Sequence, residues 1–463
     1  MNRGSESDTY RLLIHQVDGT ELLLRTEERG LSLPSVEVAK GERVAPQVRK
    51  AVKDHWGLET VCLFSASSSQ VALSPARYEV LESYGLGDEP PHGCDWFPVQ
   101  SLSESSFLDR EEFRVIRSAR DRLESYASGR IPGTFGKPGW LREVFKWVDS
   151  EIAALGLRTT GQFRQLNACP TFSLLRLETN GPALWFKAVG EPNLREYPIT
   201  ILLAKHFPAF VPRIIANQKD WNAWLATEVE GTHLDSSSPF DRWAAVARTL
   251  ADLQIASYGQ TLNLIDAGSR DLRVSSLVGL VDPFLEVMAE LMEQQTQVSP
   301  SPLCRSELLE LGARLEAALS EFGIYGIPDT LGHLDFNPGN ILISGDRCVF
   351  LDWAEASVGP PCVTFQFLLE HLRQLRVPDR FFEPGLALAY IERWRFLVDP
   401  EAMSAAIAAV PLIALFTYAV AGNSWREAAR LRHPSSAGHL RSLARRMKRE
   451  ADALEERKAL CLC

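Results

Sequence analysis

Residues 332–342 read GHLDFNPGNIL, and residues 349–353 read VFLDW. These segments place a carboxylate (Asp335), a carboxamide (Asn340) and a second carboxylate (Asp352) around a Pro-Gly turn and between apolar runs. The apolar runs are typical of two short strands joined by a turn at residues 344–346. A hairpin of that length predicts that Asp352 folds back beside Asn340.

These three side chains suit metal-dependent phosphoryl transfer. Such a reaction needs a carboxylate that orients the acceptor hydroxyl and oxygen ligands that hold Mg²⁺ against the phosphates. We assign Asp335 to the hydroxyl, and Asn340 with Asp352 to the metal. The competing interpretation is an ordinary loop, because Asp and Asn commonly cap Pro-Gly turns. The combined presence of Asp352 and an upstream lysine favours the catalytic interpretation.

That lysine is Lys187, in the apolar run 183–189, which follows the run 173–178 across a turn at residues 179–182. This order predicts an antiparallel strand pair. A lysine at this place can reach the α- and β-phosphates of a nucleotide if a carboxylate holds it. Glu196 is the candidate partner, and Pro198 requires it to lie at the start of its helix. The alternative is an edge lysine that prevents strand aggregation.

Together the motifs resemble the protein-kinase-like fold, and the Asn-Pro-Gly-Asn form is most similar to the aminoglycoside phosphotransferase family. The family's segment usually reads His-Gly-Asp-Leu-His-Pro-Gly-Asn, so Leu334 stands in place of Gly and Asn337 in place of the second His. Leu334 adds bulk beside the catalytic carboxylate and can narrow the acceptor site. The resemblance implies ATP as phosphoryl donor, with the backbone of Glu228 and Val229 pairing with adenine at a hinge between two lobes.

The loop before the lysine strands departs from the kinase pattern. Residues 166–172, LNACPTF, occupy the place of the kinase glycine-rich loop but contain no glycine. Backbone amides can still reach phosphate there, although Pro170 has no N–H to contribute. We therefore expect looser nucleotide binding.

A separate unit precedes the kinase-like region. Apolar runs at residues 10–16 and 21–25 flank Asp18 and Gly19, which is a strong hairpin signal. A helix is predicted from about residue 44 to residue 56, ending at Gly57. The order resembles a Nudix hydrolase domain, whose helix carries glutamates that hold magnesium on a diphosphate.

The Nudix motif is damaged in this chain. Ala51 stands where the motif has its leading helix Glu, and Asp54 and His55 stand where it has a pair of Glu residues. Val36 stands in place of the motif's Gly. Only Glu42 and Asp54 remain as acidic candidates, too few for a hard divalent cation. We expect this domain to be catalytically inactive and to serve as a scaffold or a ligand sensor.

These patterns predict an α+β chain: a protein-kinase-like two-lobed phosphotransferase fold preceded by a small α/β Nudix-like domain. The expected boundaries are residues 1–127 for the Nudix-like domain, 128–139 for a Gly/Pro-rich linker, 140–231 for the nucleotide-binding N lobe and 232–463 for the helical C lobe. An apolar stripe within residues 140–155 predicts a helix that braces the N lobe.

Composition sets limits on location and partners. The 463 residues allow two or three cores, and the net charge of -10 disfavours a nucleic-acid binder. Neither a signal peptide nor an apolar run long enough to span a bilayer is expected, which predicts a cytoplasmic protein without a membrane partner. Eight scattered cysteines favour reduced thiols, and the pair Cys461 and Cys463 is interpreted as a frayed terminus.

Two classes of function fit the sequence. The first is an ATP- and Mg²⁺-dependent small-molecule kinase that phosphorylates a hydroxyl of an unidentified acceptor. The second is a non-catalytic pair of degenerate domains that binds a nucleotide or metabolite and regulates a partner. Retention of Asp335, Asn340 and Asp352 together favours the enzyme.

Overall fold

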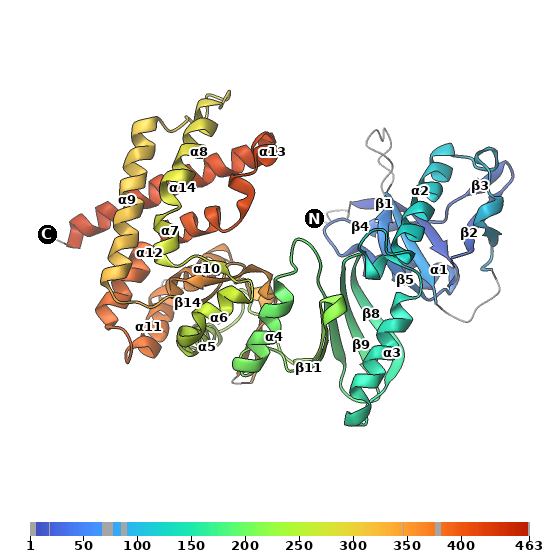
Figure 1. The fold of residues 1–463 in the computed structure, drawn as a ribbon, viewed down its shortest axis with the longest axis horizontal. Coiled ribbons are helices and arrows are strands. Elements are labelled where there is room, and N and C mark those ends of the chain that lie inside the picture. Colours follow the sequence, from blue (N-terminus) through green and yellow to red (C-terminus); the bar gives the residue numbers. More distant parts are fainter. Residues whose placement is uncertain are drawn as a thin grey trace. The chain divides into compact units, whose positions relative to one another are not determined.

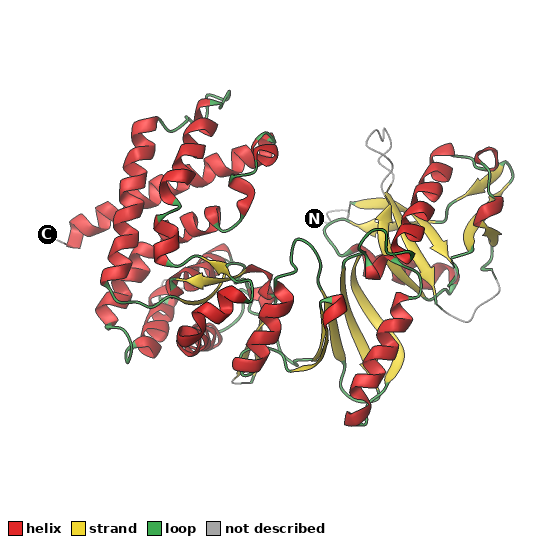
Figure 2. Ribbon diagram, in the orientation of Figure 1, coloured by secondary structure: helices red, strands yellow, loops and turns green. Residues whose placement is uncertain are grey.

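The computed structural model describes residues 6–17, 19–66, 77–84, 90–345, 347–375 and 381–461. Asp18 of the predicted first hairpin, Asp346 of the predicted second one, and Cys463 lie outside these residues. The chain divides into two compact units, Met1–Tyr197 with Arg213–Glu228, and Pro198–Pro212 with Val229–Cys463. Helices and sheets occur in both units (Figures 1 and 2), which is the expected α+β content.

A seven-stranded sheet begins the first unit. Its order is β3 (Gly30–Ser32), β2 (Glu21–Glu27), β1 (Ser7–His15), β6 (Arg77–Ser83) and β5 (Thr60–Ala66), while β4 (Ser35–Ala39) pairs with β1 and β7 (Cys94–Pro98) with β2. The β1–β6 pair is parallel and the other pairs are antiparallel.

Helices cover both faces of this sheet. Helix α1 (Val44–Trp56) buries Ala45, Val48 and Val52 on one face and ends at Gly57, whose φ is +69°. The predicted helix is therefore confirmed. Helix α2 (Arg110–Ala127) packs on the other face, and the Asp109 carboxylate caps it by accepting from the backbone N–H of Glu111.

A second, five-stranded antiparallel sheet follows in the order β11 (Ile214–Gln218), β12 (Ala223–Thr227), β10 (Leu184–Ala188), β9 (Phe172–Thr179) and β8 (Thr159–Cys169). Helix α3 (Trp140–Ile152) buries an apolar stripe in one core with Leu175, Leu177, Leu184 and Phe186 of this sheet. The predicted bracing helix is thus confirmed, and Lys187 lies on the opposite face because strand side chains alternate.

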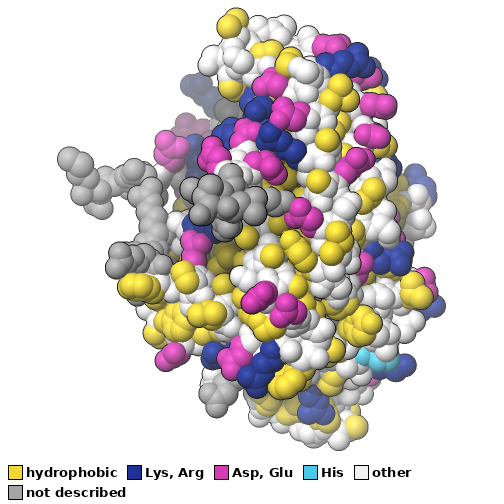
Figure 3. All heavy atoms as spheres, turned by 90° about the vertical axis from the view of Figure 1, so that its left-hand side faces the viewer, with side chains coloured by type: hydrophobic (Ala, Val, Ile, Leu, Met, Phe, Trp, Pro, Cys, Tyr) yellow, Lys and Arg dark blue, Asp and Glu magenta, His cyan; other side chains and the backbone are white. Residues whose placement is uncertain are grey.

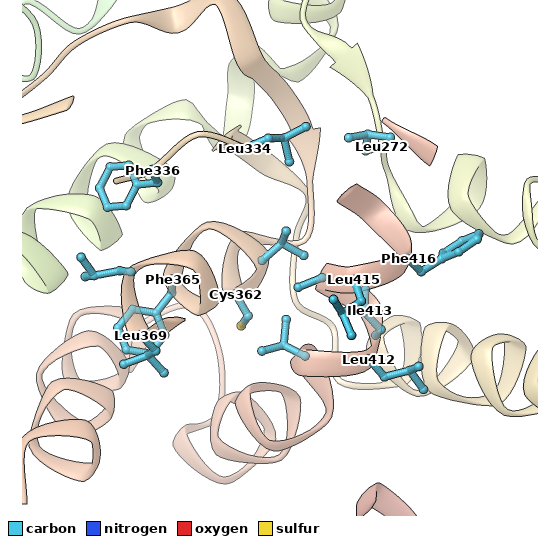
Figure 4. Close-up of a cluster of buried hydrophobic side chains, with 14 of the residues drawn as sticks. Leu272, Leu334, Phe336, Cys362, Phe365, Leu369, Leu412, Ile413, Leu415 and Phe416 are labelled. Carbon is cyan, nitrogen blue, oxygen red and sulfur yellow. The ribbon is translucent and has the colours of Figure 1, made fainter. Parts of the chain in front are cut away.

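The second unit is mainly helical. Its helices are α5 (Phe240–Ser257), α6 (Thr261–Asp266), α7 (Val274–Val278), α8 (Val281–Glu293), α9 (Arg305–Ile324), α10 (Pro361–Gln374), α11 (Phe382–Trp394), α12 (Pro400–Val420), α13 (Ala428–Leu431) and α14 (Pro434–Cys461), and α4 (Glu196–His206) enters it from the first unit. One large hydrophobic core contains residues of these helices, and Figure 4 shows part of it, including Cys362, Phe365 and Leu369 of α10 and Leu412 and Ile413 of α12.

The predicted catalytic residues lie in segments that two short sheets of this unit flank. The sheet β13 (Arg270–Asp271), β17 (Ala356–Gly359) and β14 (Thr330–His333) precedes the Asp335 segment. The hairpin β15 (Ile341–Ser344) and β16 (Arg347–Phe350) follows it, with Ile341 paired to Phe350.

One sequence expectation about membranes is wrong. Helix α12 has 21 residues with a mean hydropathy of 2.0 in its most apolar window, so among the described residues one helix is long and apolar enough to cross a membrane. However, 67% of that window is buried. This burial is how a core helix of a soluble protein is packed, and it explains the apolar composition without a bilayer.

The basic C-terminal helix α14 also packs into the core. Its Leu440, Leu443 and Met447 are buried, and Arg441 and Arg445 donate to backbone carbonyls of Leu291 and Ser301. On the face of the molecule in Figure 3, Lys and Arg side chains alternate with Asp and Glu and form no continuous basic patch.

Candidate active site

The segment after β14 forms a turn fixed by its own side chains. Asn337 precedes the short helix Pro338–Asn340, and its carboxamide oxygen accepts from the backbone N–H of Gly339 at 2.8 Å. Asn is favoured before such a turn because its side chain replaces a missing backbone acceptor. The turn carries the chain from Asp335 into strand β15.

The same turn directs two carboxamides at Asp335. The Nδ2 of Asn337 donates to Oδ1 of Asp335 at 2.8 Å, and the Nδ2 of Asn340 donates to Oδ2 at 3.1 Å. Asn340 also donates to the backbone carbonyl of Asp335 at 2.9 Å. Both carboxylate oxygens are therefore held in a fixed orientation, and each keeps a lone pair for a further donor.

The hairpin brings Asp352 beside Asn340, as the spacing predicts. The backbone N–H of Leu351 donates to the carbonyl of Asn340 at 2.9 Å, immediately before Asp352. Asp352 itself has φ of +61° and ψ of +68°, a left-handed conformation that is uncommon outside glycine. Such backbone strain concentrates at functional sites, where the surrounding structure enforces it.

A buried histidine ties the two carboxylate segments together. His333 is 1% exposed, and its Nδ1 accepts from the backbone N–H of Asp335 at 3.2 Å. Its Nε2 then carries the proton and donates to the carbonyl of Leu351 at 3.0 Å. Burial lowers the pKa of His333, which agrees with a neutral ring in this tautomer.

The structure corrects the expectation for Leu334. Its backbone N–H donates to the carbonyl of Glu355 at 3.0 Å, and its side chain is only 8% exposed within the hydrophobic core of the second unit. Figure 4 shows it among the buried apolar side chains. Leu334 therefore packs mainly into the core.

In the first unit, Lys187 and Glu196 form the ion pair that the sequence predicts. The Nζ of Lys187 lies 2.5 Å from Oε1 of Glu196, the first residue of α4, and both side chains are largely buried. The ammonium also lies 5.9 Å from the ring centre of Phe172 and 5.7 Å from that of Trp224. A buried carboxylate and two aromatic faces thus hold this cation in one place.

The predicted hinge residue Glu228 has a specific set of partners. Its carboxylate accepts from Nε and Nη2 of Arg176 at 2.6 and 2.8 Å and from the indole N–H of Trp185 at 3.2 Å. The Arg176 hydrogen bond lowers the pKa of Glu228. Its backbone N–H donates to the carbonyl of Ala183 at 3.1 Å, so only its carbonyl remains for a base. The chain passes into the second unit at Val229.

Helix α1 and the residues before it include the acidic positions for which the sequence suggests a Nudix resemblance. Asp54 forms an ion pair with Lys50, His55 contacts the carbonyl of Ala51, and Glu42 is exposed. Among the described residues, no three His, Cys, Asp or Glu side chains are grouped to hold a metal ion.

Asn340 and Asp352 likewise provide only two candidate side-chain ligands for a metal ion. Magnesium is usually bound by one or two carboxylates together with waters and substrate phosphates, so a two-residue oxygen set fits it. Carboxylate and carboxamide oxygens are the ligand type that this hard cation prefers.

Sequence reasoning missed the contacts of His333, Asn337 and Phe172. The roles of His333 and Asn337 depend on hydrogen bonds that no spacing reveals. The ring centre of His333 lies 5.8 Å from that of Phe336 and 4.9 Å from that of Trp353, and the sequence does not show these contacts either.

One family model matches part of the chain. Residues 191–405 match the APH family model, described as phosphotransferase enzyme family. The match covers somewhat less than half of the chain and includes Glu196, Asp335, Asn340 and Asp352. Residues 191–405 are therefore similar to this phosphotransferase family.

Solved structures similar to the chain include kinases of small molecules. The macrolide 2'-phosphotransferase MphH from Brachybacterium faecium is 15% identical, with 65% of this chain and 98% of that chain covered and a TM-score of 0.43. An ethanolamine kinase of Plasmodium vivax is 13% identical, with 72% and 94% covered and a TM-score of 0.45. The choline kinase LicA from Streptococcus pneumoniae is 12% identical, with 66% and 99% covered and a TM-score of 0.39. A comparison with curated proteins finds no match.

Proposed function

We propose that this chain is a cytoplasmic, protein-kinase-like O-phosphotransferase that uses ATP and Mg²⁺ to phosphorylate a hydroxyl of a small molecule. The observation that carries the proposal is the joint placement of Asp335, Asn340 and Asp352 by one turn, one hairpin and His333. The family match over residues 191–405 supports the reaction class.

In the proposed reaction, Asp335 orients the acceptor hydroxyl and takes its proton as the new O–P bond forms. The bond between the γ-phosphorus and the β–γ bridging oxygen breaks, and that oxygen leaves with ADP. When bound, Mg²⁺ neutralises charge on the phosphate oxygens. Asn340 and Asp352 would hold it, while Lys187, fixed by Glu196, holds the α- and β-phosphates.

The carbonyl of Glu228 and the backbone of Val229 are the groups that we assign to adenine. Residues 140–231 then act as the nucleotide-binding N lobe, and residues 232–463 as the C lobe that carries the acceptor site. The N-terminal residues 1–127 form a Nudix-like domain without hydrolase activity, joined by residues 128–139.

Release of ADP in the presence of a panel of hydroxyl-bearing compounds tests this function. The panel contains amino alcohols, sugars, macrolides and aminoglycosides, since the fold does not select among them. We expect acceptor-dependent ADP release by the wild type and by the control Asp121→Asn, an exposed carboxylate on α2. Loss of release in Asp335→Asn supports the assignment. Nucleotide binding with no ADP release for any acceptor would favour the non-catalytic alternative.

A further inference from the structure

The outer edge of the five-stranded sheet is covered by the N-terminal residues. Strand β8 is the edge strand. The side chain of its Gln165 forms two hydrogen bonds with the backbone of Cys62 in β5, as a neighbouring strand would. The backbone N–H of Cys62 donates to Oε1 of Gln165 at 2.9 Å, and Nε2 of Gln165 donates to the carbonyl of Cys62 at 2.8 Å. Both residues are buried.

Helix α1 adds a second attachment to the same strand. The guanidinium of Arg49 lies 3.9 Å from the ring centre of Phe163, and its Nη1 donates to the carbonyl of Phe163 at 3.2 Å. Its Nε donates to the carbonyl of Thr60 at 2.5 Å, so one side chain joins α1, β5 and β8. The helix in the position of the Nudix metal helix therefore serves as a contact surface for β8.

The third attachment reaches the turn between β8 and β9. The backbone N–H of Phe135 donates to the carbonyl of Pro170 at 2.9 Å, and Phe135 is 3% exposed. A Cβ added at Gly136 would lie 3.0 Å from Cβ of Pro170 and 2.9 Å from the ring of Tyr126. Only a glycine allows the connector to approach the turn this closely.

The other side of this turn faces the phosphate-binding lysine. Phe172, the first residue of β9, contacts the ammonium of Lys187 through its ring. Thr171 packs so tightly against Gly190 that an added Cβ there would lie 2.4 Å from Cβ of Thr171. The turn is thus held between the N-terminal connector and the strand that carries Lys187.

We propose that the N-terminal domain and its connector position the phosphate-binding turn at residues 169–172, with Phe135, Gly136, Gln165 and Arg49 as positioning residues. This assignment rests on the proposed function. A turn without glycine cannot rely on local backbone freedom to wrap the phosphates. Fixed contacts from outside the sheet order it before nucleotide binds, which removes the entropic cost of ordering it during binding.

The competing explanation is that these residues only shield a sheet edge, a common need of exposed strands. The two explanations differ in what a variant changes. Loss of a cover lowers the melting temperature but leaves nucleotide affinity unchanged in the folded protein. Displacement of the turn weakens nucleotide affinity even where the protein is fully folded.

The test is the Kd for ATP with Mg²⁺, measured by calorimetry on the full chain, together with the melting temperature without nucleotide. Gly136→Ala should displace the turn, because the added Cβ meets Pro170 and Tyr126. Gln165→Leu removes both hydrogen bonds to Cys62. Arg49→Ala is a milder variant, because it only shortens a side chain and adds no atom to the core. Gly323→Ala in α9 is the control, because a Cβ there meets no atom within 4 Å.

We expect the Kd to rise about ten- to hundredfold in Gly136→Ala and Gln165→Leu, less in Arg49→Ala, and not in the control. Wild-type affinity in the folded variants would overturn this assignment alone. A wild-type chain that binds no ATP with Mg²⁺ would overturn the proposed function and this assignment together. If Gly136→Ala or Gln165→Leu fails to fold, unchanged affinity in Arg49→Ala is the overturning result.

Discussion

Asp335 is the residue on which the proposed chemistry depends most. Its two carboxylate oxygens accept from Asn337 and Asn340, and the equally sized Asn removes the base and loses one of these two hydrogen bonds. The turn is still held by the bonds from the Gly339 N–H to Asn337 and from Asn340 to the backbone carbonyl of residue 335. We expect Asp335→Asn to bind ATP like the wild type but to lose turnover by about two to four orders of magnitude. Turnover and nucleotide affinity are measured on the same sample. Loss of ATP binding in this variant would assign Asp335 to architecture.

His333 makes a second prediction at this scale. Phe in its place removes the partner of the Asp335 N–H and of the Leu351 carbonyl, both in part-buried positions, which costs at most about 1–3 kcal/mol for each group. We expect His333→Phe to lower the free energy of unfolding and to reduce turnover more than nucleotide affinity. Chemical denaturation and steady-state kinetics provide the readouts. A variant with wild-type turnover would show that the ring does not position Asp335.

Some features of single residues could be predicted from the sequence, and others could not. Asp335, Asn340 and Asp352 could be predicted to lie together because a short hairpin fixes their register. The side chain of Leu334 could not be placed, since it depends on which face of the segment after β14 meets the core. The hydrogen bond from the side-chain amide of Asn337 to Asp335 could not be predicted either, because several side-chain rotamers are compatible with a Pro-Gly turn.

At the scale of elements, helices were the most predictable feature. An apolar stripe ending at Gly57 predicted the helix at about residues 44–56, and Pro198 correctly required Glu196 to begin α4. The turn at residues 169–172 could be recognised as lacking glycine. Its attachment to Phe135 depends on contacts between distant segments, which local propensity does not encode.

Strand β6 gives a prediction for pH. Glu79 is buried, and burial raises its pKa from 4.5 to about 7, although Ser65 donates to it at 2.6 Å. The unfolded chain therefore loses this proton first, and the free energy of unfolding decreases as the pH rises from about 4.5 to 7. Glu79→Gln does not titrate. The free energy of unfolding of Glu79→Gln, relative to that of the wild type, should therefore increase by up to about 3 kcal/mol across that pH window.

Urea denaturation at pH 5 and pH 8 measures this difference. Glu28→Gln, an exposed position in the same unit, is the control and should track the wild type at both pH values. An advantage of Glu79→Gln that is equal at both pH values would contradict a buried carboxyl with a raised pKa.

At the scale of the whole molecule, composition was ambiguous in one respect. Helix α12 is apolar enough for a membrane, yet it is the centre of the second unit's core. A sequence alone cannot separate these two environments, because lipid and a protein interior select the same side chains. Similarly, a Gly/Pro-rich connector predicts a linker, whereas Phe135 and Gly136 within it are buried.

The N-terminal domain carries a prediction for the full chain. Because only Glu42 and Asp54 remain of the Nudix-type acidic residues, we expect no release of phosphate or nucleoside monophosphate from nucleoside diphosphate derivatives. Glu42→Gln should leave phosphoryl transfer unchanged. Hydrolysis by the wild type that Glu42→Gln abolishes would instead make the chain a bifunctional enzyme.

The central claim is that Asn340 and Asp352 hold Mg²⁺ against the phosphates of ATP, and metal-dependent stabilisation by ATP tests it without knowledge of the acceptor. ATP with Mg²⁺ should raise the melting temperature of the wild type, in line with about 2.7 kcal/mol at one hundred times the Kd, and much less with a chelator. Asp352→Asn, which tolerates the left-handed backbone, should lose the metal-dependent part. Equal shifts with and without Mg²⁺ in the wild type would contradict the account.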